Sequence, residues 1–182
     1  RGLAQAKESA RAAADWGHTA IYSSPLIRTM QVAEEIKRVT SVGIVAKPGL
    51  KELLLGDLEG VTGEEMREGW TDVFHRWRES PDLVKMPNGE SLAQLQDRAW
   101  ETIISIENDH GDDESVVVVS HNFAIRAIIG ALVGMPLANF HRLSLALGSL
   151  SIFDSDGRAT APERIRRLVS YNSTDHLSPE NR

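Results

Sequence analysis

A histidine stands at the junction between a strand-like and a helix-like stretch of the sequence. Val116–Val119 are four consecutive β-branched residues, and Ser120, His121 and Asn122 follow them directly. A short valine run predicts a strand that is buried on both faces, as in a parallel sheet covered by helices. In such sheets ligands bind beyond the carboxyl ends of the strands, where helix N-termini attract anions. His121 is therefore a candidate anion ligand, and the alternative is that it only caps the following helix.

An arginine occupies a similar place after another predicted strand. Ala20–Ser23 form a strand-like segment, Ser24 and Pro25 favour a turn that starts a helix, and Arg28 falls one turn later. A guanidinium that points back over the strand ends suits a phosphate or a carboxylate through its paired N–H donors. The alternative for Arg28, taken alone, is an ordinary exposed arginine on a helix surface.

Acidic residues among leucines form the third candidate group. The segment 50–60 contains Glu52, Asp57 and Glu59, has no regular hydrophobic period and holds two glycines, which together predict a loop. Partial burial among the leucines would raise a carboxyl pKa toward the range that a general acid needs. The alternative is that these are solvated loop acids.

Other kinds of catalytic site find no support in the sequence. There is no cysteine, and no GxSxG, GxxxxGK[ST] or GxGxxG motif is present. The remaining histidines lack a strand-end setting, and no pair of them has the spacing of metal ligands, so we expect no metal site. They are His18, His75, His110, His141 and His176.

The elements that must position these residues alternate along the chain. Hydrophobic spacing and capping residues predict helices at about 3–15, from Pro25 and from Ser91, and after Val119 to about Val133. Thr62 and Glu65 form another capping box, followed by apolar residues at helical spacing up to Trp77. Strands are predicted at 20–23, 44–46, 116–119, 147–153 and 164–170, the last two joined by a turn at 154–157. This order predicts a single α/β domain over 1–182, a three-layer sandwich with a mainly parallel sheet.

Composition sets the limits for partners and location. The 182 residues are 41% hydrophobic and 25% charged, and the net charge of −6 argues against a nucleic-acid-binding surface. No apolar run approaches the roughly 18 residues of a membrane span, and no signal peptide opens the chain. We therefore expect a cytoplasmic protein with no nucleic-acid or membrane partner.

Four short motifs occur together in order, and each is weak alone. They are Ser24–Arg28, Leu50–Glu52 with Gly56 and Glu59–Gly60, Gly89–Ser91, and Val119–His121. Together they resemble the histidine phosphatase superfamily, which includes the cofactor-dependent phosphoglycerate mutases and many broad phosphatases. The start of the chain, Arg1–Ala6, also looks like the "ERGxxQA" helix start of that family, and the resemblance extends to about Leu177.

The resemblance implies a role for each candidate residue. Arg28 would hold the phosphoryl group, and His121 would be the second active-site histidine, which contacts the same group. Glu52 would donate a proton to the leaving oxygen and later activate water. The backbone N–H groups of Asn122 and Phe123 would bind the substrate at the helix start. A small phosphorylated substrate is the expected partner, with no metal and no cofactor, and a homodimer stays open.

The chain departs from the family pattern at one essential place. The family's nucleophile is another histidine, in an Arg-His-Gly motif that ends the first, central strand, and none of it is present. His18 does not replace it, because it follows the first predicted helix instead of a strand. The chain starts at Arg1 without methionine, and loss of a central strand would leave backbone groups unpaired. We therefore expect an upstream segment in the natural protein and no turnover by these 182 residues.

The branch of the family is predicted from residues that a mutase would need. Mutases of this pattern carry a tyrosine where this chain has Leu55 and a lysine where it has Gly63. They also carry paired arginines after a tryptophan, where this chain has Trp77 followed by Arg78 and Glu79. These differences favour a phosphatase. A phosphoglycerate mutase and a non-catalytic phosphate-binding or regulatory protein without the nucleophile remain the alternatives.

Overall fold

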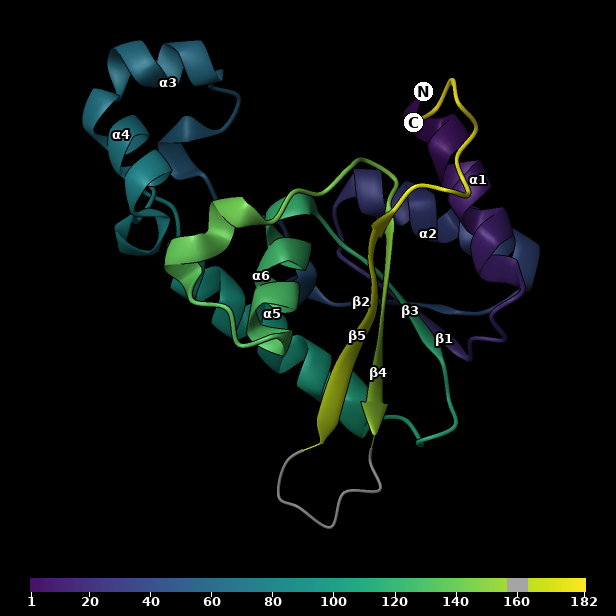
Figure 1. Ribbon diagram of the computed structural model, residues 1–182. Coiled ribbons are helices and arrows are strands. Elements are labelled where there is room, and N and C mark those ends of the chain that lie inside the picture. Colours follow the sequence, from purple (N-terminus) through teal and green to yellow (C-terminus); the bar gives the residue numbers. More distant parts are fainter. Residues whose placement is uncertain (157–163) are drawn as a thin grey trace.

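A parallel sheet with the strand order β2-β1-β3 forms the centre of the molecule (Figure 1). The structure is a computed structural model, and it describes residues 1–156 and 164–182. The strands are β1 (Ala20–Ser23), β2 (Ile44–Ala46) and β3 (Val116–Val119). Ser23 is in register with Val119. The chain therefore leaves β1 and β3 at the same edge of the sheet, toward Ser24 and Ser120.

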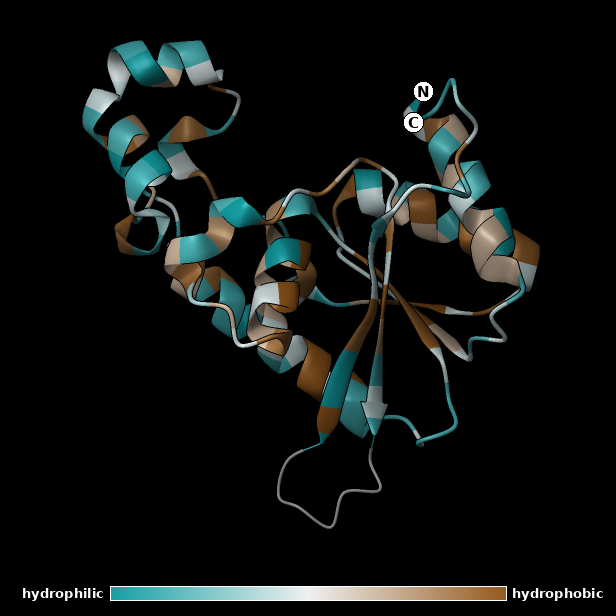
Figure 2. Ribbon diagram, viewed as in Figure 1, coloured by the Kyte–Doolittle hydropathy of each residue, from teal (hydrophilic) through white to brown (hydrophobic). Residues whose placement is uncertain are grey.

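Helices cover both faces of this sheet, as the predicted three-layer arrangement requires. Side chains of neighbouring strand residues point to opposite faces. Ile21 packs in a cluster with residues of α1 (Gly2–Ala14) and α2 (Ile27–Thr40), whereas Tyr22 packs in a cluster with residues of α5 (Leu92–Asn108) and α6 (Asn122–Leu132). Figure 2 shows hydrophobic residues gathered on the central strands and on the helices beside them. The α/β class with a parallel sheet is thus confirmed.

The last two strands form an antiparallel pair, and their predicted boundaries were wrong. They are β4 (Leu150–Asp156) and β5 (Ile165–Ser173). The predicted turn at Asp154–Asp156 is instead the end of β4, where Asp154 lies opposite Arg167 and Asp156 opposite Ile165. An ion pair of 3.8 Å between Asp156 and Arg167 favours strand pairing at residues that alone favour a turn. Gly157, the fourth predicted turn residue, lies outside the described residues.

The segment after the Glu52 loop forms two short helices where the spacing indicates one. They are α3 (Gly63–Gly69) and α4 (Thr71–Glu79), which Figure 1 shows away from the sheet. Thr62 begins α3 with the predicted capping box, and Ser91 begins α5 with the other. Trp70 interrupts the helix because its backbone leaves helical values (φ −132°, ψ 42°). Short 3₁₀ turns complete the connections, at Pro48–Leu50, Gly56–Leu58, Pro81–Leu83 and Leu137–Arg142.

β3 is less buried than its sequence predicts. All four valines are half-buried, although four consecutive apolar residues indicate burial on both faces. Across residues 1–156 and 164–182, β3 has one hydrogen-bonded neighbour, β1. Its other edge borders a cavity, and this open edge is the physical reason for the difference. In the same part of the chain, every helix is too short or too polar to cross a lipid bilayer.

Candidate active site

Arg28 and His121 meet at the carboxyl ends of β1 and β3. The Arg28 Nε lies 3.0 Å from the His121 Nδ1, and the His121 Nε2 lies 2.8 Å from the hydroxyl of Ser24. Because a guanidinium only donates, Nδ1 accepts this bond, and Nε2 then carries the proton and donates it to Ser24. Ser24 and His121 are buried, whereas Arg28 extends into solvent. The strand ends therefore hold a fixed imidazole and an accessible cation side by side.

His121 is uncharged at neutral pH. Burial, and then the charges of Arg28 and Arg98, lower its pKa from 6.5 to about 4. A neutral imidazole is the form that accepts the Arg28 hydrogen bond. A phosphate dianion placed against it would supply the opposite charge and would raise the pKa again. At neutral pH the positive charge of the pair therefore lies on Arg28.

Glu52 reaches the N-terminus of α6 and not open solvent. Its Oε1 accepts hydrogen bonds from the backbone N–H groups of Leu53 (3.0 Å), Phe123 (3.1 Å) and Ala124 (3.2 Å). Burial raises the pKa of Glu52, although these N–H donors and the charge of Arg28 act in the opposite direction. The predicted burial of this loop acid is therefore observed. A protonated carboxyl in this place is able to act as a general acid.

One of the predicted substrate donors at the helix start has a partner within the protein. The N–H of Phe123 donates to both carboxylate oxygens of Glu52, at 3.1 and 3.3 Å, and its role toward a substrate stays a prediction. The positive end of α6 thus holds a carboxylate of the protein itself. Asn122 lies beside the cavity, and its side-chain amide donates to the carbonyl of Leu145 at 3.0 Å.

A cavity of about 340 Å³ brings the predicted site residues together. Arg28, Glu52, His121 and Asn122 all line it. The open edge of β3 forms part of the lining, and the segment Leu145–Leu150, which leads into β4, forms another part. A cation, a neutral imidazole and a raised-pKa carboxyl around one cavity can bind a phosphoryl group and transfer a proton to its leaving oxygen.

A second histidine does not accompany His121 at this cavity within the described residues. His18 is buried between α1 and β1, and His75 lies on α4. His110 follows α5 and bonds Tyr22, His141 lies in the 3₁₀ segment near Trp77, and His176 bonds Ser9.

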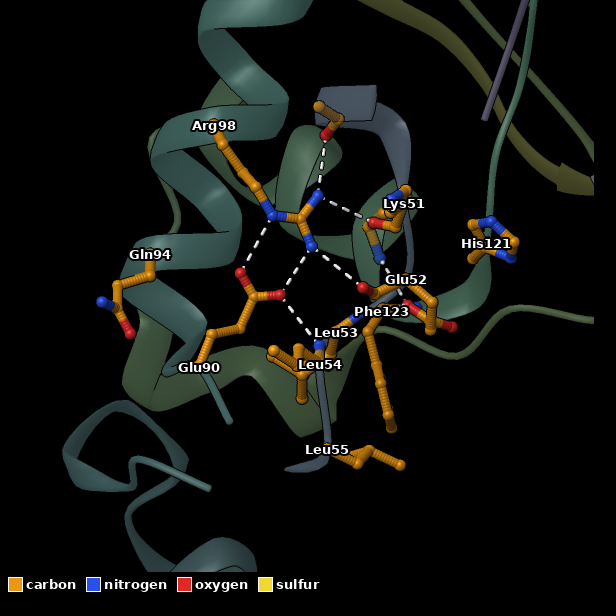
Figure 3. A network of polar contacts seen from close by, with 12 residues as sticks. Lys51, Glu52, Leu53, Leu54, Leu55, Glu90, Gln94, Arg98, His121 and Phe123 are labelled. Atoms are coloured by element: carbon orange, nitrogen blue, oxygen red, sulfur yellow. Dashed lines mark hydrogen bonds and ion pairs between the residues drawn. The ribbon is translucent and has the colours of Figure 1, made fainter. Parts of the chain in front are cut away.

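Sequence reasoning missed three residues that shape the site. The sequence indicates Ser24 as part of a turn and of the Ser24–Arg28 motif, but not that its hydroxyl fixes the ring of His121. The sequence marks Glu90 only as part of the Gly89–Ser91 motif, and no sequence feature marks Arg98. Figure 3 shows both of them joined to the loop that carries Glu52. The signal for Arg98 was weak, because nothing in an amphipathic helix marks one arginine as turned inward.

The fold and the cavity define the chain as an α/β protein with a candidate anion site at the carboxyl ends of parallel strands. The model of the histidine phosphatase superfamily (branch 1) matches residues 1–167, and the chain belongs to this family. This confirms the resemblance given by the four motifs.

Two curated relatives represent both branches of the predicted activity. The chain is 32% identical to phosphoserine phosphatase 1 of Hydrogenobacter thermophilus over 177 residues, which cover 97% of this chain and 81% of the relative. It is 28% identical to a 2,3-bisphosphoglycerate-dependent phosphoglycerate mutase of Rhizobium meliloti over 170 residues, covering 90% of this chain and 80% of the mutase. Phosphatases and mutases are thus both among its relatives.

Solved structures agree on the fold. Bacillus stearothermophilus YhfR superposes with a TM-score of 0.87 at 24% identity, over 96% of this chain and 83% of that protein. A mycobacterial glucosyl-3-phosphoglycerate phosphatase gives a TM-score of 0.84 at 24% identity, over 94% and 85% of the two chains.

Proposed function

We propose that the protein is a phosphatase that hydrolyses phosphate monoesters of small molecules through a phosphohistidine intermediate. The observation that carries this proposal is the shared cavity of Arg28, His121 and Glu52, in which burial raises the pKa of the carboxyl. The phosphatase among the relatives supports hydrolysis. The nucleophilic histidine is proposed to come from residues outside these 182, because the cavity has no second histidine among the described residues.

The first chemical step transfers the phosphoryl group from the ester oxygen to the nucleophilic nitrogen. The P–O bond to the leaving group breaks while a P–N bond forms, and Glu52 gives its proton to the leaving oxygen. Arg28 stabilises the equatorial oxygens, where phosphoryl-transfer transition states carry most charge, and His121 contacts the same group and holds the Nε of Arg28. In the second step Glu52, now ionised, takes a proton from water, and the P–N bond breaks as phosphate forms.

The mutase remains the second candidate because one of the relatives has that activity. Leu55 and Gly63 stand where mutases of this pattern carry polar contacts to the substrate, and this difference favours hydrolysis. The two activities are compared by supplying 3-phosphoglycerate to the natural-length protein, meaning the 182 residues together with the proposed segment that carries the nucleophilic histidine. Release of phosphate faster than formation of 2-phosphoglycerate is expected, and much faster isomerisation would show that the mutase assignment is correct.

The activity itself is tested with p-nitrophenyl phosphate. The natural-length protein should hydrolyse it, and the His121→Asn variant should lose most of that rate. The 182-residue chain alone should show no turnover. Turnover by the 182 residues that depends on His121 would refute the proposed external nucleophile, whereas an inactive natural-length protein that binds phosphate would favour the non-catalytic alternative.

A further inference from the structure

A bidentate ion pair behind Glu52 joins α5 to the segment that precedes it (Figure 3). The Nε of Arg98 donates to Oε1 of Glu90 at 2.9 Å, and one Nη donates to Oε2 at 2.6 Å. The side chains are 27% and 14% exposed, respectively. Neither residue lines the cavity. The pair therefore influences chemistry only through the residues that it holds.

The other donors of Arg98 bind the backbone of the loop that carries Glu52. One Nη donates to the carbonyls of Gly49 and Lys51, both at 2.8 Å, and the second Nη donates to the carbonyl of Glu52 at 2.9 Å. Together with the two bonds to Glu90, all five guanidinium N–H groups have an acceptor. Gly49 lies in the 3₁₀ turn Pro48–Leu50, whereas Lys51 and Glu52 lie outside any helix or strand, so the guanidinium provides bonds that regular structure provides elsewhere.

Glu90 binds the backbone of Leu54, which follows Glu52 in the same loop. Its Oε2 accepts the N–H of Leu54 at 2.8 Å, and its own backbone N–H donates to the carbonyl of Leu54 at 3.0 Å. The approach is so close that a Cβ on Gly89 would lie 2.3 Å from that carbonyl oxygen. The loop is thus held on both sides of Glu52, by Arg98 before it and by Glu90 after it.

We propose that Arg98, oriented by Glu90, is a positioning residue that fixes the backbone of Glu52 so that its carboxyl group reaches both α6 and the cavity. This inference rests on the proposed function, in which Glu52 protonates the leaving oxygen. A lysine at position 98 would keep the charge, but three donors on a flexible stem do not match five fixed acceptors. The guanidinium geometry, and not the charge alone, is what the loop requires.

The test compares leaving groups in natural-length protein carrying Arg98→Lys. An alkyl phosphate needs a proton on its leaving oxygen, whereas 2,4-dinitrophenyl phosphate leaves readily as an anion. A displaced Glu52 should lower kcat/KM for the alkyl ester about 10- to 100-fold and leave the dinitrophenyl ester nearly unchanged. Equal losses on both esters, or no loss on either, would overturn the proposal, because a purely structural defect does not distinguish leaving groups.

Arg166→Lys is the matched control. Arg166 on β5 makes an equivalent bidentate pair with Glu107 of α5, with distances of 2.9 and 2.6 Å, and does not contact the Glu52 loop. The same substitution there should reduce stability and keep the wild-type ratio of the two kcat/KM values. If Arg98→Lys does not fold, Glu90→Gln removes the ion pair with little change in size and should change the ratio in the same direction.

Glu52→Gln separates this inference from the proposed function. If it leaves the ratio of the two esters unchanged, the general-acid assignment fails. If it changes the ratio and Arg98→Lys does not, only the positioning role fails. An NMR titration of ¹³C-labelled glutamate in the 182-residue chain needs no turnover. Arg98→Lys should bring the pKa of Glu52 down toward its ordinary value, and an unchanged pKa in the folded variant would overturn the inference.

Discussion

The two sides of the cavity are built in different ways. On the Glu52 side, Arg98, Glu90 and the start of α6 provide hydrogen bonds to one short loop. On the opposite side, the edge of β3 faces the cavity, and its valines are half-buried. The Glu52 side is completed by side chain-to-backbone hydrogen bonds among the described residues, whereas the open edge of a strand leaves backbone N–H and C=O groups that need pairing or cover from another segment. The described residues therefore already hold the carboxyl group of Glu52 in place.

The largest expected effect belongs to Glu52→Gln. An amide cannot give up a proton, so kcat/KM for alkyl phosphates in the natural-length protein should fall about 10²- to 10⁴-fold. Because burial raises the pKa of Glu52, the wild-type rate should fall as the pH rises above that pKa. A pH profile measures both, and the variant should lose this limb. An unchanged pH profile in the variant would show that Glu52 is not the general acid.

Arg28→Ala tests the side of the cavity at the carboxyl ends of β1 and β3. Loss of its guanidinium should reduce kcat for p-nitrophenyl phosphate about 10²- to 10³-fold, as for removal of a key donor to a developing oxyanion. Arg28→Lys should recover only part of the lost kcat, because a lysine ammonium lacks the planar pair of donors. Steady-state kinetics with both variants measures the difference. A loss below about threefold for Arg28→Ala would mean that this exposed arginine is only a surface residue.

His121 should make the stability of the 182-residue chain depend on pH. Its pKa is lowered to about 4 in the folded state, so between that value and 6.5 the unfolded chain binds the extra proton. Stability is then lost as the pH falls, by about 2 kcal/mol from pH 7 to pH 5. Urea unfolding of wild type and His121→Asn at both pH values measures it. The variant should lack this part of the slope, and equal slopes would contradict the lowered pKa.

The smallest expected effect lies outside both sides of the cavity. Thr62→Ala removes the hydroxyl that accepts the N–H of Glu65 at 3.2 Å, which should cost about 1 kcal/mol of stability. The kinetic constants of the natural-length protein should stay unchanged, because α3 does not line the cavity. Chemical denaturation and an assay on the same variant test this. A large kinetic loss would show that α3 contributes to the site as well.

Several features followed from local sequence. The valine run gave β3, the capping boxes at Thr62 and Ser91 gave the starts of α3 and α5, and the motifs gave the family. These succeeded because short-range hydrogen bonds and hydrophobic spacing decide them. The predicted end of β4 was wrong because a pairing strand, and not the local residues, decides whether Asp154–Asp156 form a turn or extend the strand.

The sequence by itself determined which residue types were present for phosphoryl chemistry and that Arg28 and His121 follow strands. Only the tertiary structure decided where their hydrogen bonds go. The N–H of Phe123 serves Glu52, and Arg98 turns inward to the loop. Such contacts join positions far apart in the chain, and each is stable only because packing removes competing water. That dependence on the whole fold is why no local pattern predicts them.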